Sequence, residues 1–111
     1  AYISGGVGYA TDWQASSDIR LKENVLPIEN ALNKVLNING VYFNFINDDD
    51  KRQKIGVIAQ EIEKILPEIV STNQYGMKSV SYGNLTAILL ESIKELNDKI
   101  IELENILKNK E

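Results

Sequence analysis

The chain has 111 residues, of which 43% are hydrophobic, and a formal net charge of -4 at pH 7. This length predicts one small domain, close to the lower limit at which a chain buries a core alone. The acidic balance argues against a nucleic-acid partner, and the sequence has no apolar run long enough to predict a membrane span. We therefore expect a globular domain that binds neither nucleic acid nor membrane.

The sequence contains no histidine and no cysteine, which restricts the chemistry it can perform. Without cysteine, disulfides and thiolate metal sites are excluded. Without histidine, the commonest general base and metal ligand is missing, so any nucleophile has to use Lys, Asp, Glu or a chain terminus. We predict no metal site and no cofactor.

Residues 1–16 contain three glycines and show neither helical nor strand periodicity. We predict an extended or irregular segment that needs a partner surface. Because the sequence starts at Ala1 rather than at a methionine, we also expect it to be part of a longer protein.

The next stretch carries candidate catalytic residues. Ser17 precedes Lys22 by five residues, and a hydroxyl beside an amine can form a Ser-Lys nucleophilic pair. Both residue types are common, so the spacing alone favours a plainer interpretation, which is a loop leading into a helix with Lys22 solvated.

The middle of the chain alternates helical and strand patterns. Pro27 suits the first position of a helix, and the apolar residues that follow repeat at helical spacing: Ile28, Ala31, Leu32, Val35 and Leu36. Residues 41–46 and 54–58 are predicted to form two strands that pair.

The polar turn between these strands contains three adjacent aspartates, Asp48, Asp49 and Asp50. Adjacent aspartates suggest calcium, but an EF-hand loop needs alternate ligands, a glycine and a distant glutamate. This spacing is absent from the sequence, so we predict a solvated loop.

The C-terminal part is predicted to contain a short helix over 59–66 that Pro67 stops, a turn over 71–76, a strand over 77–82 and a helix from the N-cap Asn84 to about Lys108. The long helix carries an apolar stripe with alternating steps of four and three residues: Leu89, Ile93, Leu96, Ile100, Leu103 and Leu107. These steps indicate about three heptads of a coiled coil. The alternative is an amphipathic helix packed on its own domain.

Four sequence blocks follow one another in a characteristic order: Ser17–Val25, Ile55–Glu63, Leu66–Val70 and Val80–Leu85. They resemble, in the same order, the motifs of the intramolecular chaperone (peptidase S74) domains at the C-terminus of phage tail spikes, tail fibres, neck appendages and endosialidases. The likeness extends from Ser17 to about Leu107, nearly the whole chain.

The resemblance implies an α+β domain with short antiparallel strands, short helices and a long C-terminal helix in a trimeric coiled coil. It divides the chain into the end of an upstream fibre or spike (1–17), a globular chaperone region (18–83) and a coiled-coil helix (84–111). Ile at a with Leu at d favours dimers in parallel coiled coils, so we expect the globular region to set the trimer.

The resemblance also implies a function. The domain would direct folding and homotrimerisation of the upstream part of its own chain and then release itself by one autoproteolytic cut. Ser17 and Lys22 would be the catalytic dyad, and the cut would fall between Ser17 and Asp18. These events would occur in the host cell cytoplasm during virion assembly, and the released domain would be absent from the mature virion. The alternative is a structural trimerisation cap that does not cleave.

Two points of chemistry remain open from sequence. Attack of Ser17 on its own carbonyl would give a strained four-membered lactone, so either Ser17 acts on another chain or an N-to-O acyl shift cuts at Ser16–Ser17. A lysine acts as a base only when neutral, a form that apolar burial and the charge of Arg20 would favour and Asp18 would oppose. Because a small monomer offers little burial, we expect cleavage to wait for assembly.

Overall fold

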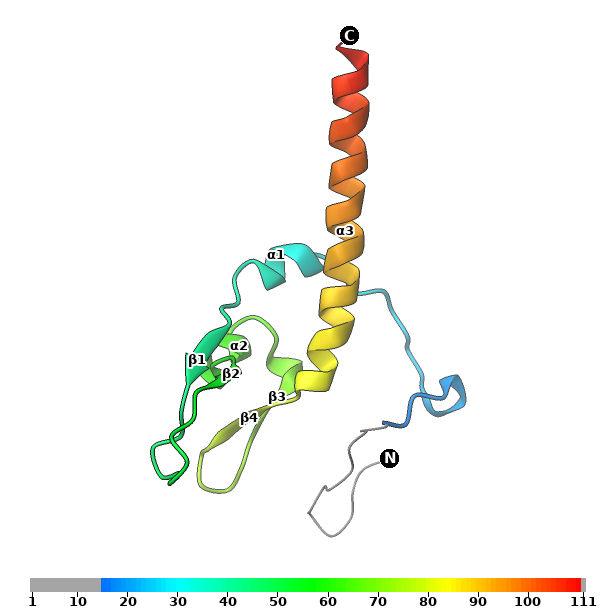
Figure 1. Ribbon diagram of the computed structural model, residues 1–111. Coiled ribbons are helices and arrows are strands. Elements are labelled where there is room, and N and C mark those ends of the chain that lie inside the picture. Colours follow the sequence, from blue (N-terminus) through cyan, green and yellow to red (C-terminus); the bar gives the residue numbers. More distant parts are fainter. Residues whose placement is uncertain (1–14, 111) are drawn as a thin grey trace.

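The computed structural model describes residues 15–110. Two small antiparallel sheets and several short helices lie beside one long C-terminal helix, α3 (Tyr82–Asn109), as Figure 1 shows. This arrangement confirms the predicted α+β class. Over the described range, no helix is long and apolar enough to cross a membrane.

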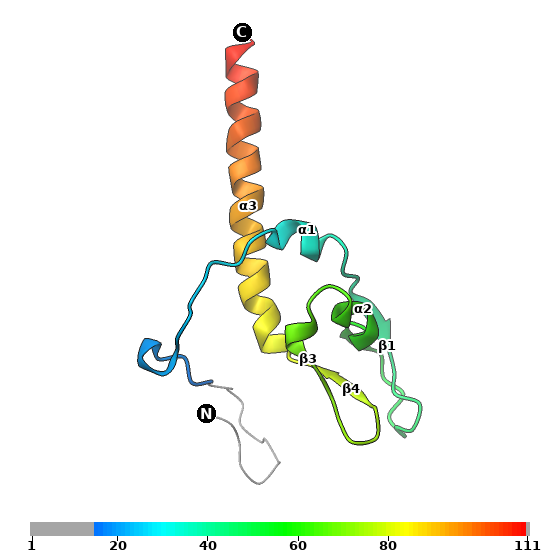
Figure 2. The same cartoon turned by 180° about the vertical axis from the view of Figure 1, so that it is seen from behind.

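The N-terminal arm, residues 15–30, leaves the body on the opposite side of α3 from the sheets (Figures 1 and 2). Its regular structure is one turn of 3-10 helix, η1 (Ile19–Leu21). The predicted upstream segment, residues 1–17, lies outside the described residues except for its last three.

The arm ends at α1 (Ala31–Val35), which is shorter than predicted. The expected start at Pro27 is wrong because Asn30 adopts a left-handed conformation, with φ of 57°, that interrupts any helix before it. Ile28 and Val35 still pack against the core, and Ala31 is fully buried. Leu36, predicted to be on the buried face, is exposed at the C-cap.

The N-terminus of α1 is capped by a side chain from α3. Asn30 makes no side-chain capping bond. Instead, Glu95 Oε2 accepts a hydrogen bond from the Ala31 backbone N–H at 2.8 Å, and Glu95 Oε1 accepts one from the Leu32 N–H at 3.3 Å. A carboxylate at this position satisfies free amides and interacts favourably with the helix dipole. The contact therefore fixes α1 on α3.

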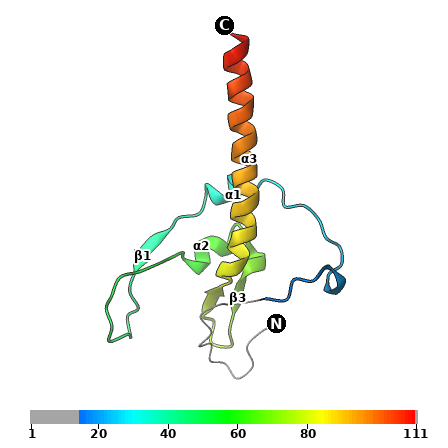
Figure 3. The same cartoon turned by 45° about the vertical axis from the view of Figure 1, so that its right-hand side comes forward.

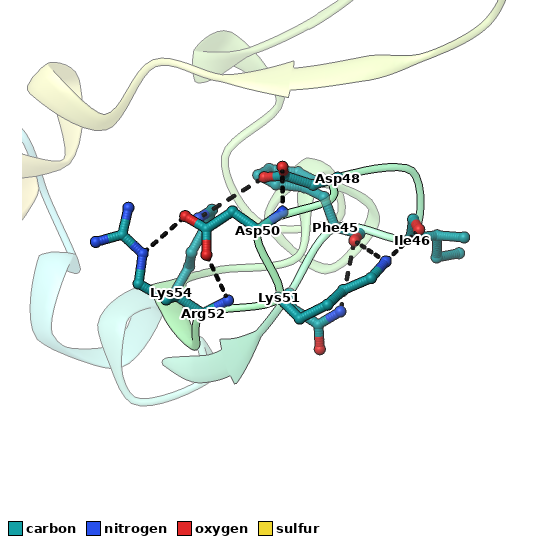
Figure 4. A network of polar contacts seen from close by, with 8 residues as sticks. Phe45, Ile46, Asp48, Asp50, Lys51, Arg52 and Lys54 are labelled. Carbon is teal, nitrogen blue, oxygen red and sulfur yellow. Dashed lines mark hydrogen bonds and ion pairs between the residues drawn. The ribbon is translucent and has the colours of Figure 1, made fainter.

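The first sheet pairs β1 (Val41–Phe43) with β2 (Lys54–Gly56), with Val41 opposite Gly56. Both strands occur where they were predicted, but they end early. Residues 44–53 instead form a loop held by its own polar side chains (Figure 4).

In this loop the Asp48 and Asp50 side chains accept hydrogen bonds from backbone N–H groups two residues ahead. Asp50 also pairs with Arg52 at 2.7 Å, and the Lys51 amine donates to the Phe45 carbonyl at 3.3 Å. Figure 4 shows these groups folded toward one another. The aspartates thus act as turn-forming acceptors.

The second sheet pairs β3 (Val70–Thr72) with β4 (Lys78–Val80). The predicted turn over 71–76 is wrong at its start, because the strand continues through Thr72. The turn begins at Asn73, whose side-chain oxygen accepts hydrogen bonds from the N–H groups of Tyr75 and Met77. The Asn73 side chain therefore fixes where the turn starts, which the polar composition of the segment did not indicate.

Between the sheets lie α2 (Ala59–Glu63) and the 3-10 turn η2 (Pro67–Ile69). The predicted helix over 59–66 is too long, and Pro67 begins η2 instead of ending α2. Pro suits this place because the first residue of a helical turn needs no N–H partner. The buried apolar residues among those described are Ala31, Ile62, Leu66, Ile69 and Ile88, of which Ile62 lies in α2, Ile69 in η2 and Leu66 between them.

The helix α3 begins at Tyr82, after the N-cap Ser81, so the prediction of Asn84 as N-cap is wrong. The Tyr82 hydroxyl accepts a hydrogen bond from the Val57 N–H at 3.1 Å. A Cβ atom at Gly56 would lie 2.5 Å from that hydroxyl, so any larger residue would displace the Tyr82 side chain. This contact between β2 and the first turn of α3 fixes where the helix starts.

The C-terminal half of α3 projects beyond the body (Figure 3). Every residue from Leu96 to Lys110 is exposed. The radius of gyration is 18.5 Å, against about 13 Å for a compact domain of this length. α3 contacts the body through its first half alone, by way of the face that carries Leu85, Ile88, Ser92 and Glu95.

The Glu95 cap yields a stability prediction. Glu95→Ala removes both acceptors from partly buried amides, so the free energy of unfolding is expected to fall by about 1–3 kcal/mol. Urea unfolding at one fixed protein concentration measures this, since assembly also stabilises the folded state. Glu102→Ala, at an exposed position on the same helix, is the matched control and should change stability by less than about 0.5 kcal/mol. Equal effects of the two substitutions would contradict the capping role.

Candidate functional site at the Ser17–Lys22 turn

The two predicted catalytic residues are in direct contact. Lys22 Nζ lies 2.8 Å from Ser17 Oγ, with the ammonium donating to the hydroxyl. The same separation suits the reverse arrangement, in which a neutral amine accepts the hydroxyl proton. The structure therefore brings together the nucleophile and the base that the sequence suggested.

The contact results from a local reversal of the chain. In η1 the Leu21 N–H donates to the Asp18 carbonyl at 3.0 Å, and the Lys22 N–H donates to the Ile19 carbonyl at 3.1 Å. This tight turn returns Lys22 to Ser17 after five residues. The interval between the two residues thus contains the N-cap Asp18 and the three residues of one 3-10 turn.

Asp18, on the C-terminal side of the predicted cleavage bond, caps this turn. Its Oδ1 accepts from the Arg20 backbone N–H at 2.9 Å, and its carboxylate forms a two-pronged ion pair with the Arg20 guanidinium, at 3.1 Å to Nε and 2.8 Å to Nη2. These hydrogen bonds from Arg20 hold the pKa of the Asp18 carboxyl below its usual 3.8, and they raise the pKa of the guanidinium.

From the sequence, Arg20 is expected to act on Lys22 as a nearby positive charge. In the structure its guanidinium is paired with Asp18 instead. Arg20 was expected to favour a neutral Lys22, and Asp18 was expected to oppose it. Because the two charges are paired with each other, each compensates the other. The only sequence signal for this pairing is the i, i+2 spacing of Asp and Arg, which by itself is uninformative.

The site is open to solvent in the single chain. Ser17 and Lys22 are exposed, and so are the apolar side chains of the turn, Ile19 at 68% and Leu21 at 74%. The described residues of one chain thus position the pair without desolvating the amine. Any apolar cover has to come from elsewhere.

Two further surfaces lie apart from this turn. A groove of about 510 Å³ is lined by side chains of both sheets and of the start of α3, among them Phe43, Val57, Ile58, Val80 and Tyr82.

Between residues 15 and 110, no three acidic side chains are grouped so that they could hold a metal ion.

The apolar stripe of α3 forms the second surface. Its six residues are between 47% and 66% exposed, and they lie on a different face from the residues that contact the body. The stripe is therefore not used to pack α3 on its own domain, which was the alternative interpretation of the heptad pattern.

Residues 17–71 match a family model described as the chaperone of endosialidase, Peptidase_S74. The chain belongs to the chaperone-of-endosialidase family. The match begins at Ser17, the first residue of the hydrogen-bonded pair. The resemblance inferred from the four sequence blocks is confirmed.

The chain is also similar to long tail fiber proteins named Gp37. It is 40% identical over 98 residues to the protein of Enterobacteria phage K3, covering 82% of this chain and 8% of the relative. For Enterobacteria phage T2 the identity is 40% over 98 residues, covering 82% and 7%. For Salmonella phage S16 it is 31% over 120 residues, covering 94% and 16%. The chain thus spans less than a fifth of the length of these relatives.

The Asp18–Arg20 pair predicts a specific titration. Asp18 should titrate below 3.8 in the folded chain, and Arg20→Gln should return it toward that value. Because the folded pKa is depressed, the stabilising contact is complete above the ordinary Asp pKa and is lost as the pH falls through the folded value. Carboxyl NMR titration measures this. Arg52→Gln, which removes the partner of Asp50, is the control and should leave Asp18 unchanged; an Asp18 that titrates identically with and without Arg20 would refute the pairing in solution.

Proposed function

We propose that this domain is a C-terminal intramolecular chaperone that directs folding and homotrimerisation of the upstream part of its own phage fibre chain. It then releases itself by one autoproteolytic cut that uses Ser17 as nucleophile and Lys22 as base. The observation that carries the enzymatic part is the 2.8 Å hydrogen bond between Lys22 Nζ and Ser17 Oγ. The chaperone part is supported by the family match and by the tail fibre relatives.

The proposed trimer is supported by the exposed stripe on α3. Contiguous exposed apolar surface on a single chain indicates an interaction site, and this stripe repeats with the heptad spacing of a coiled coil. At 1.5 Å per residue the helix is about 42 Å long. Half of that length is free to pair with other copies.

In the proposed reaction, the neutral Lys22 amine takes the Ser17 hydroxyl proton while Oγ attacks a backbone carbonyl carbon. The peptide C–N bond breaks, the leaving nitrogen takes the proton from the Lys22 ammonium, and the acyl group remains as an ester on Oγ. Water then hydrolyses the ester, which yields a new carboxylate and restores the serine.

Two bonds satisfy this scheme. In the first, Ser17 attacks the Ser16 carbonyl through a five-membered ring and cuts at Ser16–Ser17. In the second, it attacks the Ser17–Asp18 bond of a neighbouring copy, which avoids the four-membered ring. The masses of the two fragments differ by one serine residue between these routes.

Assembly supplies the proposed trigger. The Lys22 side chain is exposed to water in the single chain. Packing against neighbouring chains would remove that water, and desolvation favours the neutral form of an amine. Cleavage would then follow trimerisation in the host cell cytoplasm. Loss of the domain would make the assembled fibre kinetically trapped, because the element that aligned the chains is no longer attached.

The alternative function is a trimerisation cap that stays attached. The α3 stripe favours it equally, since the stripe serves assembly whether or not the chain is cut. The two functions differ only at the Ser17–Lys22 pair.

Substitution of the pair separates them. Ser17→Ala and Lys22→Ala are each expected to abolish self-cleavage, since each removes one partner of the proton transfer. Intact mass of the purified protein under denaturing conditions should give two fragments for the parent chain and one mass for each variant. Lys34→Ala, an exchange of the same type outside the turn, should still cleave. One uncut mass for the parent chain as well would leave the trimerisation cap.

A second prediction concerns the stripe. Leu103→Asp places a carboxylate at a d position and is expected to convert the trimer to monomer, because the charge would be buried in the assembled core. Asn105→Asp adds the same charge at an outward f position and should leave the trimer intact. Sedimentation equilibrium measures both masses. A parent chain that sediments as a monomer, or a Leu103→Asp trimer, would contradict the stripe as the assembly surface.

A further inference from the structure

The Ser17–Lys22 turn contains a second pair of functional groups that the proposed dyad does not use. The Asp18 carboxylate accepts three hydrogen bonds from the Arg20 guanidinium and one from the Arg20 backbone N–H. The contacts described for residues 17–22 all lie within this turn. Side chains of the turn itself therefore contribute to its shape, together with its backbone hydrogen bonds.

We propose that Asp18 and Arg20 are positioning residues for self-cleavage: Asp18 holds the turn that brings Lys22 to Ser17, and Arg20 keeps the Asp18 carboxylate away from the Lys22 amine. This inference rests on the proposed function of Ser17 and Lys22 and extends it to two residues that do not touch the reacting atoms.

The geometric part follows from the position of the cap. Asp18 Oδ1 binds the Arg20 N–H, and the Asp18 carbonyl binds the Leu21 N–H, so both ends of one residue hold the start of η1. A serine with an exposed side chain has no packing to fix it. Without the cap, the distance between Ser17 Oγ and Lys22 Nζ would vary, and misplaced groups react slowly.

The electrostatic part follows from the charges in the turn. Four charged side chains are close in sequence, which are Asp18, Arg20, Lys22 and Glu23. An unpaired Asp18 carboxylate, adjacent to Ser17, would compete with the serine hydroxyl for the Lys22 ammonium and keep the amine charged. Arg20 prevents this by a two-pronged ion pair with that carboxylate.

Four chains, which carry three different net charges at this pair, test the inference. The pair is neutral in the parent chain, carries -1 in Arg20→Gln and +1 in Asp18→Asn, and is neutral again in the double variant. The pH of half-maximal cleavage rate should therefore rise by about 0.5–1 unit in Arg20→Gln, fall by a similar amount in Asp18→Asn, and return to the parent value in the double variant. A purely structural role predicts that the double variant is at least as impaired as either single one.

The maximal rate at high pH tests positioning separately. Asp18→Ala removes the cap as well as the charge and should lower that rate by about 10- to 100-fold. Asp18→Asn keeps an acceptor oxygen for the Arg20 N–H and should lose clearly less. Equal losses in these two variants would refute the capping role.

A second measurement keeps the test independent of cleavage. In a Ser17→Ala background, the pH dependence of Lys22 acylation by acetic anhydride reports directly when the amine becomes neutral. The same order of midpoints is expected, with Arg20→Gln highest, Asp18→Asn lowest, and the parent and double variants between them. An uncut parent chain with this order would refute self-cleavage and support the electrostatic role of Arg20. Active cleavage with four equal midpoints would refute only the electrostatic role of the Asp18–Arg20 pair.

Discussion

The capping of α1 by Glu95 is the contact on which the arrangement of the chain depends. It joins the amides of Ala31 and Leu32 to a carboxylate more than sixty residues later, and it places the fully buried Ala31 against α3. Because the arm leads directly into α1, the same contact determines on which side of α3 the Ser17–Lys22 turn emerges (Figure 1). A local break at Asn30 and one distant acceptor thus connect the candidate site to the assembly helix.

The body has a small core and a large exposed apolar surface. The buried apolar residues of the described chain come from α1, α2, η2 and α3, together with Leu66 between α2 and η2. The stripe on α3 is exposed, and so are four apolar side chains of the arm, Ile19, Leu21, Val25 and Leu26. A domain of this size buries a smaller fraction of its surface than a larger one, so association would contribute much of its stability. The same exposure leaves the Lys22 amine in water. Stability and catalysis would therefore both depend on assembly in the proposed function.

The candidate site is unusual in its independence from the body. The contacts described between Ser17, Asp18, Arg20 and Lys22 lie within a single turn. In the proposed function, the turn positions Ser17 and Lys22, and the assembled chains would supply the apolar surroundings that activate them.

The sequence by itself determined the features that depend on near neighbours. The Ser17–Lys22 contact spans five residues, the strands at Val41 and Lys54 follow their alternation, and the heptad steps from Leu89 to Leu107 predicted a stripe that α3 does not use against its own body.

Tertiary structure alone decided the features that depend on distant partners. Glu95 lies far from the helix it caps, and the start of α3 depends on the fit of the Tyr82 hydroxyl over Gly56. The pairing of Arg20 with Asp18 is a local contact, but it too could not be predicted, because it depends on side-chain direction, which residue spacing does not reveal. Periodicity predicts which face of an element is apolar, but a boundary set by one hydrogen bond to a remote side chain leaves no periodic signal.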